Sequence, residues 1–212
     1  SQSVPLSMGR FFKELRNVLE DDALLYTDAG WPQTISGQFF ETYRPRTYIT
    51  AGGMSTMGFA LPGSLGGKLA FPNKQVVSAQ GDGSFLMMGE ELATAVQYDL
   101  PILSLILNNY GFISIRDTQL ALHGKDRTLV TEFTKSDGSL YSPDFVKLGE
   151  AYGCHAQRIS KVEEIKDAVK TAFASGKPSV LEVMVDRVHP RSMQKMYGYW
   201  DLPTPKYLDK TT

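Results

Sequence analysis

Two short segments of the chain carry oxygen-bearing groups that could bind a metal ion. Gly81-Asp82-Gly83-Ser84 and Asn108-Asn109-Tyr110-Gly111 each follow an apolar run of strand length. A carboxylate from Asp82, an amide oxygen from Asn109 and the main-chain carbonyl of Gly111 are hard oxygen ligands of the kind that Mg²⁺ prefers. Because open α/β sheets bind ligands outside the carboxyl ends of their strands, we expect these oxygens to hold a magnesium ion that carries a diphosphate.

The turn at Gly83 and Ser84 has the features of a phosphate-binding segment. A turn that leads into a helix offers free N–H groups, and the helix dipole reinforces their attraction for an anion. Gly83 lets the backbone approach a phosphate closely, and Ser84 adds a hydroxyl donor. The alternative is that Gly-Asp-Gly and Asn-Asn are ordinary turn residues after strands. Their joint occurrence on either side of one expected helix favours the binding site.

The elements that must position these residues follow from the apolar periodicity, which alternates between helices and strands. We expect strands at 24–27, 48–49, 75–79, 102–107 and 179–185. We expect helices at 8–19, 33–40, 59–70, 89–98, 143–153 and 161–175. Strands without polar alternation, separated by helices, are typical of a parallel β-sheet flanked by helices on both faces. The fold class is therefore α/β.

Polar residues next to the expected helices suggest where the helices begin. Ser7 is a candidate N-cap, Ser142 and Pro143 suit an N-cap and a first turn, and Ser160 with Glu163 has the spacing of a capping box. Each serine would accept a hydrogen bond from a free N–H group of the first helical turn.

Two segments fit no regular element. Residues 121–140 are polar, lack a clear period and are long for a plain connection, which is typical of lids. His123 in this segment could approach a substrate, although a lone loop histidine is more often solvated; His155 and His189 have less support. The tail after Arg187 is rich in aromatic residues and proline. We therefore divide the chain into a binding domain at 1–186 and a tail at 187–212 that packs on the domain or on a partner.

The composition excludes several classes of protein. The chain of 212 residues is 42% hydrophobic and has a formal net charge of −1, so it can bury a core and offers no basic stripe to nucleic acid or to an anionic membrane. Cys154, the single cysteine, excludes an internal disulfide and suits a reducing compartment. No apolar run approaches the roughly 18 residues of a membrane span. We expect a cytoplasmic protein that binds neither nucleic acid nor membrane.

The segment from Gly81 to Gly111 resembles the thiamine-diphosphate fold motif, which begins with Gly-Asp-Gly and ends with Asn-Asn. Flanking segments are similar to acetolactate synthase and its relatives, at 55–62, 91–95, 143–148, 152–153 and 178–183. The resemblance extends from about Met8 to Asp186. It matches the pyrophosphate-binding domain, which is the C-terminal third of longer relatives, and it implies the thiamine-diphosphate-binding fold.

The resemblance implies two cofactors, thiamine diphosphate and Mg²⁺. It assigns the metal to Asp82, Asn109 and the Gly111 carbonyl. The implied cofactor-binding residues are Gly30, Trp31, Ser55, Met57, Gly81, Asp82, Gly83, Ser84, Asn109, Gly111 and Phe112. Met57 would prop the cofactor in its bent conformation, and the Ser55 carbonyl would accept from the 4′-amino group. For Met57 the alternative is ordinary packing, because methionine fills gaps in many cores.

Two positions depart from the family pattern. The Gly30-Trp31-Pro32-Gln33 segment aligns with a loop that touches the diphosphate, but the family usually has Gln and His where this chain has Trp31 and Pro32. We therefore expect backbone contact around Gly30 and Trp31. Thr118 stands where biosynthetic acetolactate synthases typically carry a tryptophan. This favours a relative with another acyl donor or acceptor over a branched-chain amino acid enzyme.

The resemblance also implies a partner. The glutamate that activates the cofactor in this family lies on a pyrimidine-binding domain, which nothing in this chain matches. We expect that domain on a partner subunit or on another part of a longer chain, in a homo- or hetero-oligomer, either a dimer or a tetramer. A flavin would depend on a middle domain that is also outside this sequence.

Two functions stay open at this point. One is part of a lyase or carboligase that acts on a 2-oxo acid through an ylid and an enamine, by decarboxylation or by formation or cleavage of a C–C bond. The other is a non-catalytic binding or regulatory module that keeps the fold. The intact set of Asp82, Asn109 and Gly111 favours the enzyme. The 2-oxo acid itself is not specified.

Overall fold

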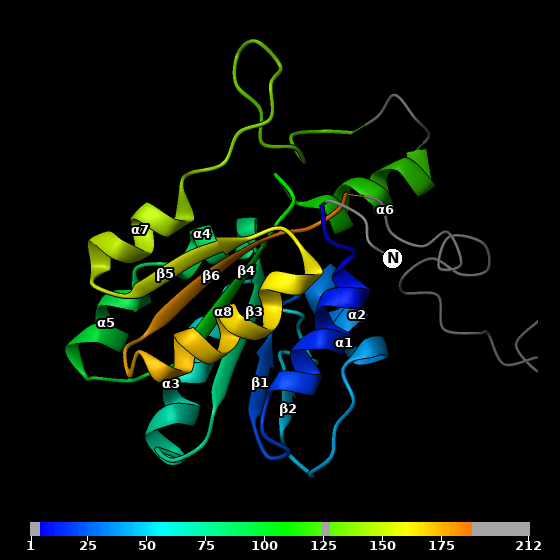
Figure 1. Ribbon diagram of the computed structural model, residues 1–212. Helices are drawn as coiled ribbons and strands as arrows, with labels where there is room; N and C mark the ends of the chain where they lie inside the picture. The colour runs from blue at the N-terminus through cyan, green and yellow to red at the C-terminus, as the bar shows by residue number, and fades with distance from the viewer. Residues whose placement is uncertain (1–4, 124–127, 188–212) are drawn as a thin grey trace, which may run out of the picture.

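A parallel β-sheet forms the centre of the molecule (Figure 1). The computed structural model describes residues 5–123 and 128–187, and within them the sheet has six strands in the order β2-β1-β3-β4-β6-β5. The strands are β1 Leu24–Thr27, β2 Tyr48–Thr50, β3 Val76–Gly81, β4 Leu103–Asn108, β5 His155–Ile159 and β6 Ser179–Met184. Leu105 of the central strand β4 pairs with Ala79 of β3 on one side and with Leu181 of β6 on the other.

Helices cover both faces of the sheet. They are α1 Met8–Val18, α2 Trp31–Phe39, α3 Ala60–Ala70, α4 Asp82–Met88, α5 Glu91–Gln97, α6 Ile113–His123, α7 Phe145–Tyr152 and α8 Val162–Ala174. One core joins α1, α2 and α8 to the sheet and the other joins α3, α4, α5 and α7. In β4, Leu103, Leu105 and Leu107 face the first core, and Ile106 faces the second. Figure 1 shows α6 beyond the carboxyl ends of the strands.

The helices that follow β1 and β3 lie on opposite faces of the sheet. The chain leaves β1 through α2 on one face of the sheet and leaves β3 through α4 and α5 on the other. This is the topological switch point at which open α/β sheets bind ligands. The carboxyl ends of β1 and β3 flank that point, and β4 is the next strand.

The α/β parallel sheet is confirmed, whereas three elements were not expected. The strand β5 was missed, and so was α6, which covers the residues after the Asn-Asn segment. The helix expected at 89–98 is α5, and a separate helix, α4, precedes it directly after β3. His123 therefore lies in the last turn of α6 and not in a loop, and it is exposed.

The expected caps are wrong by one or two residues at two helices. Ser7 occupies the N-cap position of α1 but makes no side-chain hydrogen bond there. The N-cap of α7 is Asp144, whose carboxylate accepts from the N–H of Lys147 at 3.3 Å. At α8, Lys161 is the N-cap. There Glu164, and not Glu163, accepts the Lys161 N–H at 3.0 Å.

The tail expected at 187–212 lies outside the described residues except for Arg187, as does His189. Within residues 5–123 and 128–187, no helix is long and apolar enough to cross a membrane.

Candidate functional site

Asp82 joins the ends of β3 and β4. It is the first residue of α4, directly after β3, and its side chain is fully buried. Oδ1 accepts the N–H of Gly83 at 2.9 Å, and Oδ2 accepts the N–H of Gly111 at 2.9 Å. The two segments singled out from the sequence therefore meet in the folded chain.

The environment of Asp82 favours a cation. Burial raises the pKa of its carboxyl to about 6, although the N–H groups of Gly111 and Gly83 hold the charge and lower the pKa. Each carboxylate oxygen has two lone pairs and accepts one N–H bond at 2.9 Å, with weaker contributions from the N–H groups of Tyr110 and Asn109, so acceptor capacity is left. A bound cation would use that capacity and offset the cost of burying the charge.

Asn109 and Gly111 offer two further oxygens beside Asp82. Asn109 is 5% exposed. In the described part of the chain its side chain has no hydrogen-bond partner, and the Gly111 carbonyl accepts no hydrogen bond. A carboxylate, an amide and a peptide carbonyl with unused acceptor capacity fit an ion that prefers oxygen ligands. Metal binding by this set stays a prediction.

The backbone after β4 is bent sharply at Tyr110 and Gly111. Tyr110 has φ +61°, a left-handed conformation that is unfavourable for a residue with a side chain. Its N–H donates to Oδ1 of Asn108 at 3.1 Å, as in an Asx turn. Gly111 has φ +148°, and a Cβ there would lie 2.3 Å from the Thr131 carbonyl oxygen. A glycine is required at 111 for both reasons.

Gly83 is required by close packing with Phe112. A Cβ at residue 83 would lie 2.3 Å from the Phe112 ring. The ring is held in turn by an edge-to-face contact with Phe133, at 5.1 Å between centroids. Ser84 is 4% exposed in the first turn of α4. The Gly83 N–H is used by Asp82, so the expected contacts of Gly83 and Ser84 with a diphosphate stay predictions.

Gly30 and Trp31 lie where the expected diphosphate loop was placed, and they contact α6. Gly30 is the N-cap of α2 with φ +94°, and a Cβ there would lie 2.9 Å from Ser114 Oγ. Trp31 donates from Nε1 to Oδ2 of Asp117 at 3.1 Å. Trp31 and Pro32 form the first turn of α2, which was expected to begin at Gln33. This loop is thereby fixed against the helix that follows Phe112.

Asp28 is a functional candidate that the sequence did not single out. Its carboxylate is 1% exposed and accepts the N–H groups of Gly58, Phe59 and Ala60 at 3.1, 2.7 and 2.9 Å. Burial raises its pKa, and these three bonds lower it. The contacts hold the bend that contains Ser55 against the end of β1. The signal available in the sequence was an acidic residue directly after a strand.

The bend itself carries Ser55 and Met57, both half-buried. Ser55 has φ +47°, a strained conformation. A Cβ on Gly58 would lie 2.6 Å from Cγ of Met88, so the bend also packs closely on α4. In the described residues no hydrogen bond joins Ser55 or Met57 to Asp82 or Asn109, and their roles toward a cofactor stay predictions.

Residues 28–183 match the family model described as thiamine pyrophosphate enzyme, C-terminal TPP binding domain. The chain belongs to this family. It is 37% identical over 188 residues to the probable acetolactate synthase large subunit of Methanocaldococcus jannaschii, covering 86% of this chain and 31% of that protein. The acetolactate synthase isozyme 2 large subunit of Escherichia coli is 34% identical over 176 residues, covering 83% and 31%.

A relative with a different printed activity is as similar as the Escherichia coli subunit. The 3D-(3,5/4)-trihydroxycyclohexane-1,2-dione hydrolase of Bacillus velezensis is 34% identical over 186 residues, covering 88% of this chain and 28% of that protein. The chain thus spans less than a third of the length of the curated relatives it matches. Similarity to this TPP-binding domain does not distinguish between those activities.

Two residues weighed for roles in substrate binding lie on α6. Thr118 donates from Oγ1 to the Ser114 carbonyl at 2.9 Å. His123 is exposed at the end of the same helix. His155 is half-buried at the start of β5, where its Nε2 has no partner among the described residues. None of them contacts Asp82 or Asn109 in the described part of the chain.

Proposed function

We propose that this chain is the part of a thiamine-diphosphate-dependent 2-oxo acid lyase or carboligase that holds the cofactor's diphosphate and Mg²⁺. The observation that carries the proposal is the contact between Asp82 Oδ2 and the Gly111 N–H at 2.9 Å. It brings together two strand ends whose oxygens have acceptor capacity left for a cation. The membership of the chain in the TPP-binding family supports the cofactor assignment.

In this proposal Asp82, Asn109 and the Gly111 carbonyl bind the Mg²⁺. Asp82 would contribute the single negative charge of the set, and its carboxyl would be held ionised beside the ion despite its burial. The diphosphate and water would supply the remaining oxygen ligands.

In the same proposal, the remaining cofactor residues would surround this point. Gly81, Gly83 and Ser84 at the start of α4, together with Phe112, would border the diphosphate on the side of β3. The backbone at Gly30 and Trp31 would border it on the side of β1. Met57 would support the bent cofactor, and Ser55 would accept from its aminopyrimidine.

Thiamine diphosphate, when bound, supplies a nucleophilic carbon and an electron sink for reactions of 2-oxo acids. In that chemistry this chain would bind the cofactor and orient it. Asp82 and Asn109 would hold the diphosphate end of the cofactor through the metal, and the bend that Asp28 holds would support its middle. The proton-transferring glutamate would come from outside this sequence.

We propose that a pyrimidine-binding domain, on another subunit or elsewhere in a longer chain, completes the site. The matched relatives are more than three times as long as the segment they share with this chain. The whole protein would be an oligomer. Thr118, on α6 beside the Trp31 loop, supports an acyl donor or acceptor other than that of branched-chain amino acid synthesis.

Calorimetry on the complete protein with its partner domain tests the proposal. We expect thiamine diphosphate to bind in the presence of Mg²⁺, and Asp82→Ala to weaken that binding by more than about tenfold, because a charged ligand is lost. Consumption of 2-oxo acids by the complete protein, but not by this chain alone, is the expected activity. Binding without consumption would point to the non-catalytic module, and unchanged binding by Asp82→Ala would contradict the metal site.

A further inference from the structure

Glu182 is a buried carboxylate on a strand that carries none of the proposed ligands. It lies on β6, pairs with Ile106 of β4, and is 1% exposed. Its Oε1 accepts from Nδ2 of Asn108 at 2.7 Å, and its Oε2 accepts from Nε of Arg158 at 2.8 Å. A buried charge is costly unless both oxygens are paired, so a hydrophobic residue would be the simpler choice in this apolar strand.

The carboxylate determines the orientation of the Asn108 side chain. Because Glu182 accepts hydrogen bonds, the Nδ2 donor of Asn108 faces it, and Nδ2 also donates to Ser142 Oγ at 2.9 Å. The amide oxygen then points the other way. There it accepts the N–H of Tyr110 at 3.1 Å. Reversing the amide would set its oxygen against the carboxylate and its NH₂ group against the N–H of Tyr110.

The bond between Asn108 and Tyr110 stabilises the bend at which the proposed ligands diverge. Tyr110 has φ +61°, and an Asx-type bond is one of the few local interactions that stabilise a left-handed residue. The carbonyl of Tyr110 accepts the Phe133 N–H at 2.9 Å, and the next N–H, that of Gly111, reaches Asp82. The bend therefore sets the directions of the Asn109 side chain and the Gly111 carbonyl.

We infer that Glu182 and Asn108 are positioning residues for the metal ligands Asn109 and Gly111. Neither binds the metal: Glu182 fixes the Asn108 amide, and Asn108 fixes the bend. The inference rests on the proposed Mg²⁺ site and adds to it two residues on β4 and β6 that the ligand set does not include.

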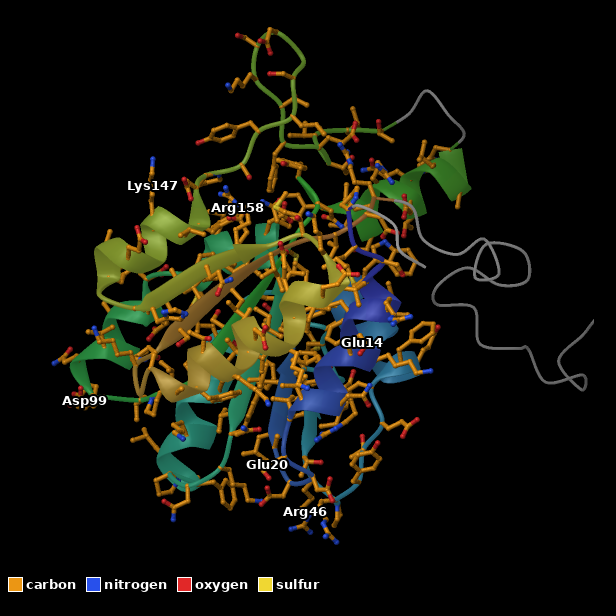
Figure 2. All side chains as sticks on the ribbon, in the orientation of Figure 1. Glu14, Glu20, Arg46, Asp99, Lys147 and Arg158 are labelled. Atoms are coloured by element: carbon orange, nitrogen blue, oxygen red, sulfur yellow. The ribbon has the colours of Figure 1, made fainter. Side chains whose placement is uncertain are left out.

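Arg158 provides a matched control. It shares the ion pair with Glu182, but its side chain is 47% exposed and also contacts Asp144 at 3.1 Å. Figure 2 shows Arg158 at the end of the molecule where α7 begins. A hollow of about 430 Å³ beside it is lined by Tyr110, Arg158 and Glu182 among others. When Arg158 is removed, water in this hollow can solvate the outer oxygen of Glu182 while Asn108 stays bonded.

The test measures binding of Mn²⁺, a spectroscopic substitute for Mg²⁺, to the complete protein by electron paramagnetic resonance at saturating thiamine diphosphate. We expect Asn108→Ala and Glu182→Met to weaken Mn²⁺ binding about tenfold, as loss of a group that orients a ligand does. Arg158→Met should change it by less than about threefold, since Glu182 still accepts from Asn108. Amide hydrogen exchange of residues 108–112 should become faster in the first two variants and stay unchanged in Arg158→Met.

The outcomes separate this inference from the proposed function. If the wild type binds no Mn²⁺, or Asp82→Ala binds it equally well, the metal site is wrong. If Asp82→Ala loses binding while Asn108→Ala and Glu182→Met keep it, the positioning role is wrong and the metal site stands. If both positioning variants fail to fold, Asn108→Ser replaces them. Its hydroxyl can accept from Tyr110 but is too short to reach Glu182, so the bend should be held in part. We therefore expect Mn²⁺ binding between that of the wild type and that of Asp82→Ala, with faster exchange at 108–112. Binding as weak as that of Asp82→Ala, or wild-type exchange at 108–112, would overturn the inference.

Discussion

Oδ1 of Asp28 accepts the backbone N–H of Phe59 at 2.7 Å, and this bond ties the end of β1 to the start of α3. The same carboxylate accepts from Gly58 and Ala60. One buried side chain thus accepts the N–H groups of the first residue of α3, of its N-cap and of the residue before it, and holds the bend there. The neighbouring β3 carries Asp82 at the equivalent end, where the carboxylate also accepts only backbone N–H groups among the described residues.

Replacing Asp28 should destabilise the protein and weaken cofactor binding. Asp28→Ala leaves three N–H groups without their acceptor, so we expect a loss of about 2–4 kcal/mol in the free energy of unfolding, measured in urea. Asp28→Asn keeps one acceptor oxygen and should lose less. The control is Asp22→Ala, which removes a half-exposed ion pair to Lys74 at 3.4 Å and should change stability by less than about 0.5 kcal/mol. Equal effects of the two alanine variants would contradict the role of Asp28.

The metal-free protein should respond to pH through Asp82. Its pKa is about 6 in the folded chain, against the ordinary 3.8 of an aspartate carboxyl. The folded state therefore binds more protons than the unfolded state between these values, and stability falls as the pH rises from about 4 to about 6.

Comparison with Asp82→Asn isolates this effect, because the other acidic groups are common to both proteins. The free energy of unfolding of the wild type relative to Asp82→Asn should fall by up to about 3 kcal/mol between pH 4 and 7. If the proposed metal site is right, Mg²⁺ with thiamine diphosphate should reverse that fall at pH 7, since the ion would bind the ionised carboxyl. A difference that does not vary with pH would show that Asp82 does not titrate in this range.

Gly83 should tolerate no side chain while Phe112 is present. A Cβ at residue 83 would lie 2.3 Å from the Phe112 ring, so Gly83→Ala should cost more than about 2 kcal/mol. In a Phe112→Ala background the same change should cost at least about 1 kcal/mol less, which a double-mutant cycle measures. Gly81→Ala is the control, because a Cβ there meets nothing within 4 Å and Gly81 has φ −71°. Additive effects of the two substitutions would refute the contact.

Trp31 should report cofactor binding by its fluorescence. The chain has two tryptophans, Trp31 and Trp200. In a Trp200→Phe variant Trp31 is the one tryptophan left in this sequence, and it lies beside Gly30 and is held by Asp117 at 3.1 Å. We expect thiamine diphosphate with Mg²⁺ to change that emission, and Trp31→Phe to abolish the change. A response that persists without Trp31 would place the cofactor away from this loop.

The central strands and the residues at their carboxyl ends could be predicted from the sequence. Buried parallel strands such as β4 are continuous apolar runs, and the polar residues that end them are conspicuous. The strand β5 was missed because it lies at the edge of the sheet, where His155, Ala156 and Gln157 are half-buried and Arg158 is exposed. An edge strand needs no apolar run.

The helices α4 and α6 were missed for different reasons. The first begins within Asp82-Gly83-Ser84, whose residue types favour turns, and it is stabilised by burial of Phe85. The helix α6 has a buried residue at Ile113, but Ser114 to Leu120 are all half-buried or exposed. Without a buried stripe, the periodicity gives no signal.

The supporting carboxylates could not be predicted because they depend on tertiary contacts. Asp28 accepts from residues about thirty positions away, and Glu182 depends on Asn108 and Arg158 from two other strands. The N-cap of α7 could not be predicted for the same reason. Asp144 rather than Ser142 begins the helix, and its carboxylate is also bound by Arg158, whereas Ser142 accepts from Asn108.

The loops at the amino ends of the strands are remote from the proposed site. Figure 2 shows Asp99, Glu20 and Arg46 at the end of the molecule opposite to Arg158. Asp99 belongs to the connection from α5 to β4, so residues inserted there would lengthen the stretch between Asp82 and Asn109 without moving either. The number of residues separating the two halves of the motif thus depends on α4, α5 and the loop that returns to β4, and related chains can differ in that number while keeping the same proposed ligands.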